Sequence, residues 1–140
     1  MLKVLVVDDE PTIATLLAEI VEEFGYEVTV AFDGRQGYEL AKGGKFSLII
    51  SDMMMPYLKG NELCLRLKQE PLAQKTCIVL MSAVPQMIQL SQSCQADAFI
   101  LKPFDISAIH QILERFLSKP DNNPHSLSLP NIENLPYFTP

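Results

Sequence analysis

The chain has 140 residues and a mass of 15.7 kDa, a size typical of a single domain. Its residues are 48% hydrophobic and 20% charged, a balance that supplies a globular core. Eleven basic and seventeen acidic side chains give a net charge of −6. This charge excludes binding to nucleic acid or to an anionic membrane surface through overall electrostatic attraction.

The sequence predicts neither export nor membrane insertion. Its N-terminus opens directly into an apolar strand, without the charged region and cleavage site of a signal peptide. The longest uncharged stretch, residues 76–96, holds four glutamines and a proline and is too polar to span a membrane. The cysteines, Cys64, Cys77 and Cys94, are odd in number and widely spaced, which favours buried free thiols. We therefore expect a cytoplasmic protein without membrane contact.

Five short apolar runs recur along the chain and predict strands. Most are continuous rather than alternating, which is typical of strands buried on both faces of a parallel sheet. The runs are residues 4–7, 28–30, 48–50, 78–81 and 98–101.

The segments between these runs have the spacing of amphipathic helices. The second helix begins after Asp33, a good N-cap, and contains Gly37, which costs about 1 kcal/mol relative to alanine. The first begins at Pro11, stops at Gly25 and carries the apolar stripe Ile13, Leu16, Leu17, Ile20, Val21 and Phe24.

Three further helices are predicted towards the C-terminus. The third covers about residues 61–69 and buries Leu63, Cys64 and Leu67. The fourth runs from Pro85 to about Cys94, with four glutamines spaced by three along one side. The fifth begins at Asp105 and buries Ile106, Ile109, Ile112, Leu113 and Phe116.

This order, β-α repeated five times, predicts an α/β fold. We expect a doubly wound (βα)5 domain over residues 1–119, a five-stranded parallel sheet with helices on both faces. The flavodoxin-like strand order 2-1-3-4-5 is the natural candidate, although the pattern alone does not fix it. Residues 120–140 hold five of the ten prolines and predict an extended tail or linker. Its apolar side chains also allow docking on its own domain or on a neighbour.

Polar residues follow four of the predicted strands. Asp8 and Asp9 come after the first strand, and Asp52, Ser82 and Lys102 follow the third, fourth and fifth. Ligands of such sheets bind at the carboxyl ends of the strands, where the first and third strands would be neighbours. Three crowded carboxylates repel one another, and Mg²⁺ together with a lysine would offset that repulsion.

Four segments at these positions give the chain a resemblance to the receiver domain of two-component response regulators, over residues 2 to about 118. They are V-L-V-V-D-D-E-P at 4–11, D-M-M-M-P at 52–56 with Gly60, M-S-A at 81–83 and F-I-L-K-P-F at 99–104.

The resemblance implies a phosphorylation site. Asp52 would accept a phosphoryl group from a histidine kinase or a small acyl phosphate, with the help of Lys102 and Ser82. Asp9, Asp52 and the backbone carbonyl of Met54 would bind Mg²⁺ directly, and Asp8 would bind it through water. Ser82 and Phe99 would then shift and repack the surface of helix 4, strand 5 and helix 5. The Lys102–Pro103 bond is expected to be cis.

Two departures from the family pattern carry predictions. The segment from Ser82 to Lys102 is about two residues shorter than is common, and Gln95 replaces the usual glycine. Helix 4 is therefore expected to be displaced or shortened, or to end differently.

Met54 and Val84, two residues beyond Asp52 and Ser82, are apolar. Their side chains cannot orient an attacking water, so self-dephosphorylation is expected to be slow.

We interpret the chain as a phosphorylation-dependent switch that catalyses its own Mg²⁺-dependent phosphorylation without being a classical enzyme. Its expected partners are a histidine kinase and a downstream protein, with no direct contact to nucleic acid or membrane, and a phosphorylation-linked homodimer stays open. The alternatives are a constitutive interaction module that uses no phosphate, or a phosphatase of another α/β class. The second would usually need an acid–base residue where Met54 stands.

Overall fold

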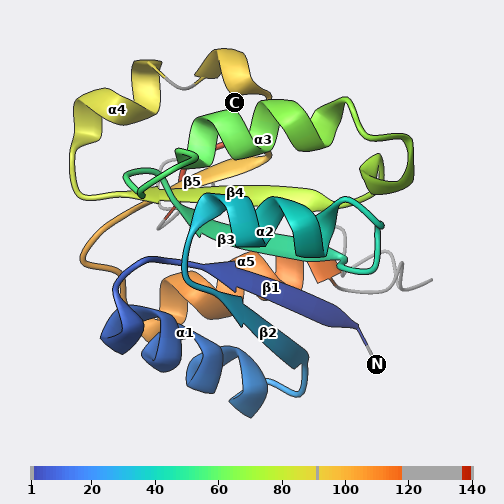
Figure 1. The fold of residues 1–140 in the computed structure, drawn as a ribbon. Coiled ribbons are helices and arrows are strands. Elements are labelled where there is room, and N and C mark those ends of the chain that lie inside the picture. Colours follow the sequence, from blue (N-terminus) through green and yellow to red (C-terminus); the bar gives the residue numbers. More distant parts are fainter. Residues whose placement is uncertain (1, 91, 118–136, 140) are drawn as a thin grey trace, which may run out of the picture.

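A parallel sheet forms the centre of the computed structural model, which describes residues 2–90, 92–117 and 137–139 (Figure 1). Within these residues the strand order is β2-β1-β3-β4-β5, which confirms the predicted topology. The strands are β1 (Lys3–Val7), β2 (Glu27–Ala31), β3 (Leu48–Asp52), β4 (Cys77–Ser82) and β5 (Ala98–Leu101).

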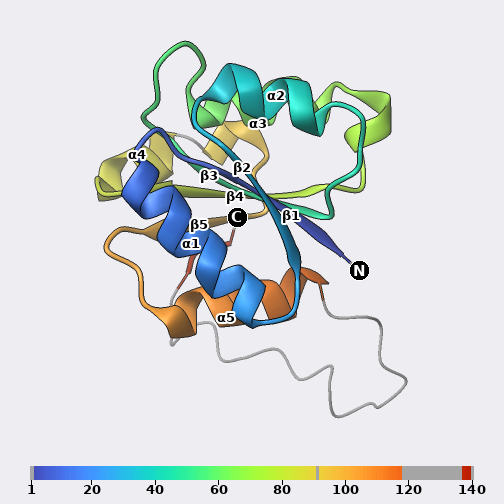
Figure 2. The ribbon, with the colours of Figure 1, turned by 60° about the horizontal axis from the view of Figure 1, so that its bottom comes forward.

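Helices cover both faces of this sheet. Figures 1 and 2 show α1 and α5 on one face and α2, α3 and α4 on the other. Two short 3-10 helices, Pro71–Ala73 and Gln92–Cys94, follow α3 and α4. The helices are α1 (Pro11–Glu23), α2 (Gly34–Ala41), α3 (Gly60–Lys68), α4 (Pro85–Leu90) and α5 (Ile106–Leu117).

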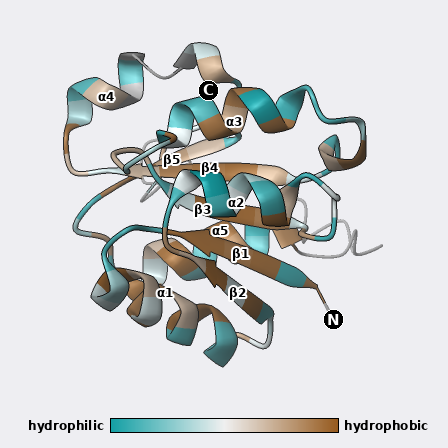
Figure 3. Cartoon of the chain, viewed as in Figure 1, coloured by the Kyte–Doolittle hydropathy of each residue, from teal (hydrophilic) through white to brown (hydrophobic). Residues whose placement is uncertain are grey.

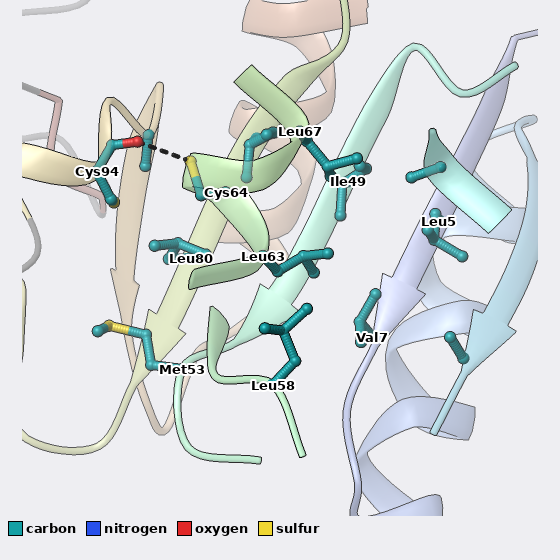
Figure 4. Packing of buried hydrophobic residues seen from close by; sticks show 14 of the residues in the cluster. Leu5, Val7, Ile49, Met53, Leu58, Leu63, Cys64, Leu67, Leu80 and Cys94 are labelled. Carbon is teal, nitrogen blue, oxygen red and sulfur yellow. Dashed lines mark hydrogen bonds between the residues drawn. The ribbon is translucent and has the colours of Figure 1, made fainter. Parts of the chain in front are cut away.

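The apolar strands supply the core of both layers, as the hydropathy colouring of Figure 3 shows. Along β1, Leu5 and Val7 face α2 and α3 in one buried cluster, whereas Val4 and Val6 face α1 and α5 in another. Figure 4 shows part of the first cluster, where side chains from β1, β3 and β4 meet those of α3. Burial on both faces explains why these strands read as continuous apolar runs.

Local signals for the first two helices are confirmed. Pro11 is the first residue of α1, and Gly25 follows its end with a φ of +95°. Asp33 caps α2, because its carboxylate accepts the backbone N–H of Gln36 at 2.7 Å. Gly37 lies where a Cβ would come within 3.0 Å of Val7, so this glycine allows α2 to lie close to β1.

The fourth helix is shorter than the apolar pattern predicted. The apolar spacing predicted that it reaches Cys94, but α4 ends at Leu90 and a 3-10 helix follows. A shortened helix was the expectation from the segment between Ser82 and Lys102, which is about two residues shorter than is common in the family. The tighter 3-10 turn brings Cys94 into the core beside α3, where its carbonyl accepts a hydrogen bond from the Cys64 thiol at 3.1 Å (Figure 4).

Some predicted core residues lie at the surface instead. Leu16 is 47% exposed and Ile106 is 57% exposed, because both line an open hollow between α1 and the start of α5. The three thiols are free; Cys64 and Cys94 are buried as expected, whereas Cys77 at the start of β4 is only half-buried. None of the helices in the described part of the chain has the length and apolar content of a membrane span.

Gln95 follows the 3-10 helix with a φ of +67°, a conformation that favours glycine. A Gln95→Gly variant should therefore raise the free energy of unfolding by about 1 kcal/mol, measured by urea unfolding. Ser93→Gly, inside the same 3-10 helix, is the matched control and should lower it. An equal loss of stability in both variants would contradict this account.

The predicted boundary after residue 119 and most of the tail lie outside the described residues. Near the C-terminus, Tyr137 and Phe138 lie against β5, where Phe138 pairs with Phe99. This placement favours the docked form of the tail over a free linker for this short segment.

Candidate functional site

The polar residues picked out from the sequence gather at the carboxyl ends of the strands, on the left side of Figure 1. Asp8 directly follows β1, Asp52 is the last residue of β3, Ser82 ends β4, and Lys102 directly follows β5. Because β1, β3, β4 and β5 are consecutive in the sheet, these positions share one edge. The topology therefore brings these side chains together, as the strand order predicts.

Three carboxylates come together at this edge. Asp8, Asp9 and Asp52 each offer one carboxylate oxygen, and these oxygens all lie within 4.8 Å of one another. Asp8 is fully buried, Asp52 is 7% exposed and Asp9 is half-buried. Such crowded acids need positive charge nearby.

The Lys102 side chain provides part of that charge. Its Nζ atom lies 3.0 Å from Oδ2 of Asp8 and 3.3 Å from Oδ1 of Asp52. Burial alone would lower the pKa of Lys102, but its hydrogen bond to Asp8 and the charges of both acids outweigh burial and raise that pKa. Lys102 is therefore a fixed cation between the carboxylates of Asp8 and Asp52.

The surroundings of Asp52 disfavour its charged form. Burial raises the pKa of Asp52, the Lys102 charge lowers it, and the Asp8 charge raises it, with a net upward shift. The backbone N–H of Met53 donates to Asp52 Oδ1 at 3.0 Å and helps to fix its orientation. The carboxylate is thus ordered but remains short of positive charge.

This upward shift predicts a pH-dependent stability. A carboxyl whose pKa is higher in the folded state stabilises the fold below the pKa of the unfolded chain, and loses that contribution as pH rises through the folded pKa. Asp52→Asn should therefore be more stable than the wild type at pH 7 without divalent cations, with a gap that closes towards pH 4, as thermal unfolding can measure. Glu19→Gln on the exposed face of α1 is the control, and an equal gain from it would contradict this explanation.

Ser82 and Phe99 also occupy their predicted positions. The Ser82 side chain is buried, and its hydroxyl accepts the Val84 N–H at 3.0 Å and donates to the Val84 carbonyl at 3.1 Å. Its hydroxyl is therefore engaged with its own loop. Phe99 is 2% exposed, in the cluster that faces α3. The Lys102–Pro103 peptide bond is cis, as expected.

The residues two positions after Asp52 and Ser82 are about half exposed to solvent. The Met54 side chain is 53% exposed and the Val84 side chain is 46% exposed. Both flank the site with apolar groups that can neither donate nor accept a proton.

Gly60 is a site residue whose role the sequence analysis missed. Its N–H donates to the Met53 carbonyl at 3.0 Å, and a Cβ at this position would lie 2.3 Å from the Asp52 carbonyl oxygen. The chain can therefore return so close to Asp52 only with glycine here. The glycine directly before a predicted helix was the available signal, but its contact comes from tertiary structure.

Comparison with known proteins places the chain in a family. The family model described as the response regulator receiver domain matches residues 4–114. The chain belongs to the response regulator receiver domains. Chemotaxis response regulator CheY4 of Vibrio cholerae is similar in structure, with a TM-score of 0.77 and 31% identity, covering 84% of this chain and 99% of that one.

Full-length response regulators are similar in sequence to this receiver domain. Response regulator ArlR of Staphylococcus saprophyticus is 32% identical over 78% of this chain and 49% of its own length. The alkaline phosphatase synthesis transcriptional regulatory protein PhoP of Bacillus subtilis is 33% identical over 94% of this chain and 55% of its own. The chain thus spans about half the length of the curated relatives it matches. Membership of the family supports a role in phosphorylation-dependent signalling.

Proposed function

We propose that this receiver domain is a phosphorylation switch in which Asp52 accepts the phosphoryl group from a histidine kinase. The observation that carries the proposal is the Lys102 ammonium, held 3.0 Å from Asp8 and 3.3 Å from Asp52 at the edge where three carboxylates meet. A buried acid beside a fixed cation suits a nucleophile whose product carries added negative charge.

The residues present suit a magnesium ion. Three carboxylates offer hard oxygen ligands within 4.8 Å of one another, and one ammonium does not balance their charge. Asp9, Asp52 and the Met54 backbone carbonyl would hold the ion directly, with Asp8 acting through water. When bound, Mg²⁺ supplies positive charge to the oxygens of the transferring phosphoryl group.

The protein's own groups define the transfer. A carboxylate oxygen of Asp52 attacks the phosphorus of phosphohistidine, the phosphorus–nitrogen bond breaks, and the imidazole, protonated on its other nitrogen, leaves with the electron pair. The product is an acyl phosphate on Asp52. Lys102 stabilises the charge on the phosphoryl oxygens, and the Met53 N–H orients the carboxylate. Catalysis is mainly positioning and electrostatics, so the domain promotes its own phosphorylation.

Ser82 and Phe99 are the proposed switch. Phosphorylation would draw the Ser82 hydroxyl from its bonds with Val84 to a phosphoryl oxygen. The buried Phe99 ring would then repack and alter the surface of α4, β5 and α5, where a downstream protein or a second copy would bind. We place this signalling in the cytoplasm, which suits the free thiols of the chain.

The alternative, a constitutive interaction module, would need none of these groups. Asp8, Asp9, Asp52 and Lys102 are all present and close together, which favours the switch. Exposure of the domain to Mg²⁺ and acetyl phosphate, followed by intact mass measurement, separates the two. The switch predicts one added phosphoryl group that EDTA prevents, whereas no added mass would favour the constitutive module.

The apolar flank of the site predicts a long-lived phosphoryl group. Met54 and Val84 cannot orient water, so hydrolysis should take minutes or longer, and Met54→Asn should accelerate it about tenfold. Loss of the phosphoryl mass over time, after removal of the donor, measures this. Leu72→Asn, at another exposed apolar position, is the control, and decay within seconds in the wild type would contradict the prediction.

A further inference from the structure

A short segment near the C-terminus extends the sheet beyond its edge strand. The N–H of Phe99 donates to the Phe138 carbonyl at 2.6 Å, and the N–H of Phe138 donates to the Phe99 carbonyl at 2.7 Å. This reciprocal exchange is the hydrogen-bonded pair of an antiparallel ladder. Figure 2 shows the segment, in red, beside β5.

Tyr137 anchors this segment in the core. Its side chain is only 2% exposed and belongs to the buried cluster that includes Ile100 of β5 and Ile109 of α5. The guanidinium of Arg115 lies 6.0 Å from the centre of the Tyr137 ring. Alternation along a strand puts Phe138 on the opposite face, where it is 48% exposed. The segment is therefore held by one buried aromatic ring and two backbone hydrogen bonds.

Among the described residues, β5 is an edge strand of the sheet, paired with β4 on one side and bridged by Phe138 on the other. The backbone N–H and C=O groups that β5 directs away from β4 are the kind that an extended peptide can pair with. This edge lies between α4 and α5, on the surface to which the proposed function assigns the output partner (Figure 1). A partner that added a strand here would have to displace Phe138 from Phe99.

We propose that the β5 edge is a docking site for an extended aromatic peptide, and that the chain's own Tyr137–Phe138 fills it as an autoinhibitory strap. The strap keeps partner peptides away from this edge in the resting state. That regulatory part rests on the proposed function, whereas the docking itself does not.

The geometry also links the strap to the phosphorylation site. Phe99 bears both strap hydrogen bonds on its backbone and is the proposed switch residue by its side chain. Lys102, three residues further along, contacts Asp52. In this proposal, the phosphorylated arrangement of β5 weakens the strap contact, so that by linkage release of the strap favours that arrangement.

Two proline variants of the full chain test the docking. Phe138→Pro removes the N–H that Phe99 accepts, whereas Thr139→Pro removes an N–H that alternation directs away from β5. Amide hydrogen exchange at Phe99 is the measurement, with Ile100, whose N–H is directed towards β4, as the internal reference. Phe99 should exchange about tenfold faster in Phe138→Pro and at the wild-type rate in Thr139→Pro. Equal rates in all three proteins would overturn the docking.

Magnesium with beryllofluoride, a phosphoryl mimic, tests the regulation. The mimic should speed Phe99 exchange in the wild type, and Phe138→Pro should saturate at about threefold lower mimic concentration. Identical saturation in both proteins would overturn the autoinhibitory role. Strap protection without any binding of the mimic would instead overturn the proposed function and leave the docking supported.

Dilution distinguishes the chain's own segment from that of a second copy. Protection of Phe99 that is unchanged on dilution, in a protein of monomer mass, supports docking within one chain. Protection that is lost on dilution together with a dimer would overturn it, and would assign the segment to exchange between copies.

Discussion

A Lys102→Ala variant will accept phosphoryl groups about 10²–10³-fold more slowly than the wild type, because it lacks the cation aimed at the phosphoryl oxygens. The same change leaves Asp8 and Asp52 buried without their shared partner and should lower the free energy of unfolding by about 3 kcal/mol. Intact mass against time and urea unfolding in Mg²⁺-free buffer measure the two effects.

Two companion variants keep this prediction falsifiable. Lys68→Ala breaks a more exposed ion pair, in which the Lys68 Nζ lies 3.5 Å from Oδ2 of Asp97. It should lower the free energy of unfolding by less than about 1 kcal/mol and leave the phosphorylation rate unchanged. Lys102→Arg keeps the charge and should recover more of the stability than of the rate, since a guanidinium cannot occupy the same position. A folded Lys102→Ala that is phosphorylated at the wild-type rate would refute the role of Lys102.

Gly60→Ala will lower the rate of phosphorylation, because the added Cβ displaces the backbone that holds Asp52. The added Cβ would lie 2.3 Å from the Asp52 carbonyl oxygen and 2.9 Å from Cα of Met53, so this backbone must move. A misplaced nucleophile costs about 10²-fold in rate, and overpacking costs about 1–3 kcal/mol in stability.

Gly43→Ala provides the control for that change, because a Cβ there meets nothing within 4 Å. It should be neutral or slightly stabilising, with unchanged phosphorylation. The rate of mass gain from acetyl phosphate and the urea midpoint should therefore separate the two alanine variants. Similar behaviour of both would show that Gly60 does not position Asp52.

The sequence was sufficient to predict the strands and the gathering of polar side chains at their carboxyl ends. Continuous apolar runs required burial on both faces, and parallel strands bring their carboxyl ends to one edge, so Asp8, Asp52 and Lys102 had to be near one another once the strand order was right. The order itself came from a fold-level expectation and is confirmed by the pairing of β1 with both β2 and β3.

Other features depend on tertiary contacts that periodicity cannot show. The pattern around α4 continued to Cys94, but the chain tightens into a 3-10 turn to bury that residue beside α3. Leu16 and Ile106 match helical stripes yet line an open hollow between α1 and the start of α5, and the packing of these two helices is not visible in either stripe. Tyr137 looked like one apolar residue in a proline-rich tail, and only its fit between β5 and α5 shows that it is buried.

The proposed switch requires Asp52 to carry the phosphoryl group as an acyl phosphate. An acyl phosphate is a mixed anhydride, so borohydride reduces its activated carbonyl and converts a phosphorylated aspartate into homoserine, which peptide mass spectrometry can locate. After treatment with Mg²⁺ and acetyl phosphate, homoserine should appear at position 52, and none should appear in Asp52→Asn or without Mg²⁺. Homoserine at position 8 or 9 instead, or at no position despite an intact fold, would show that Asp52 is not the phosphoryl acceptor.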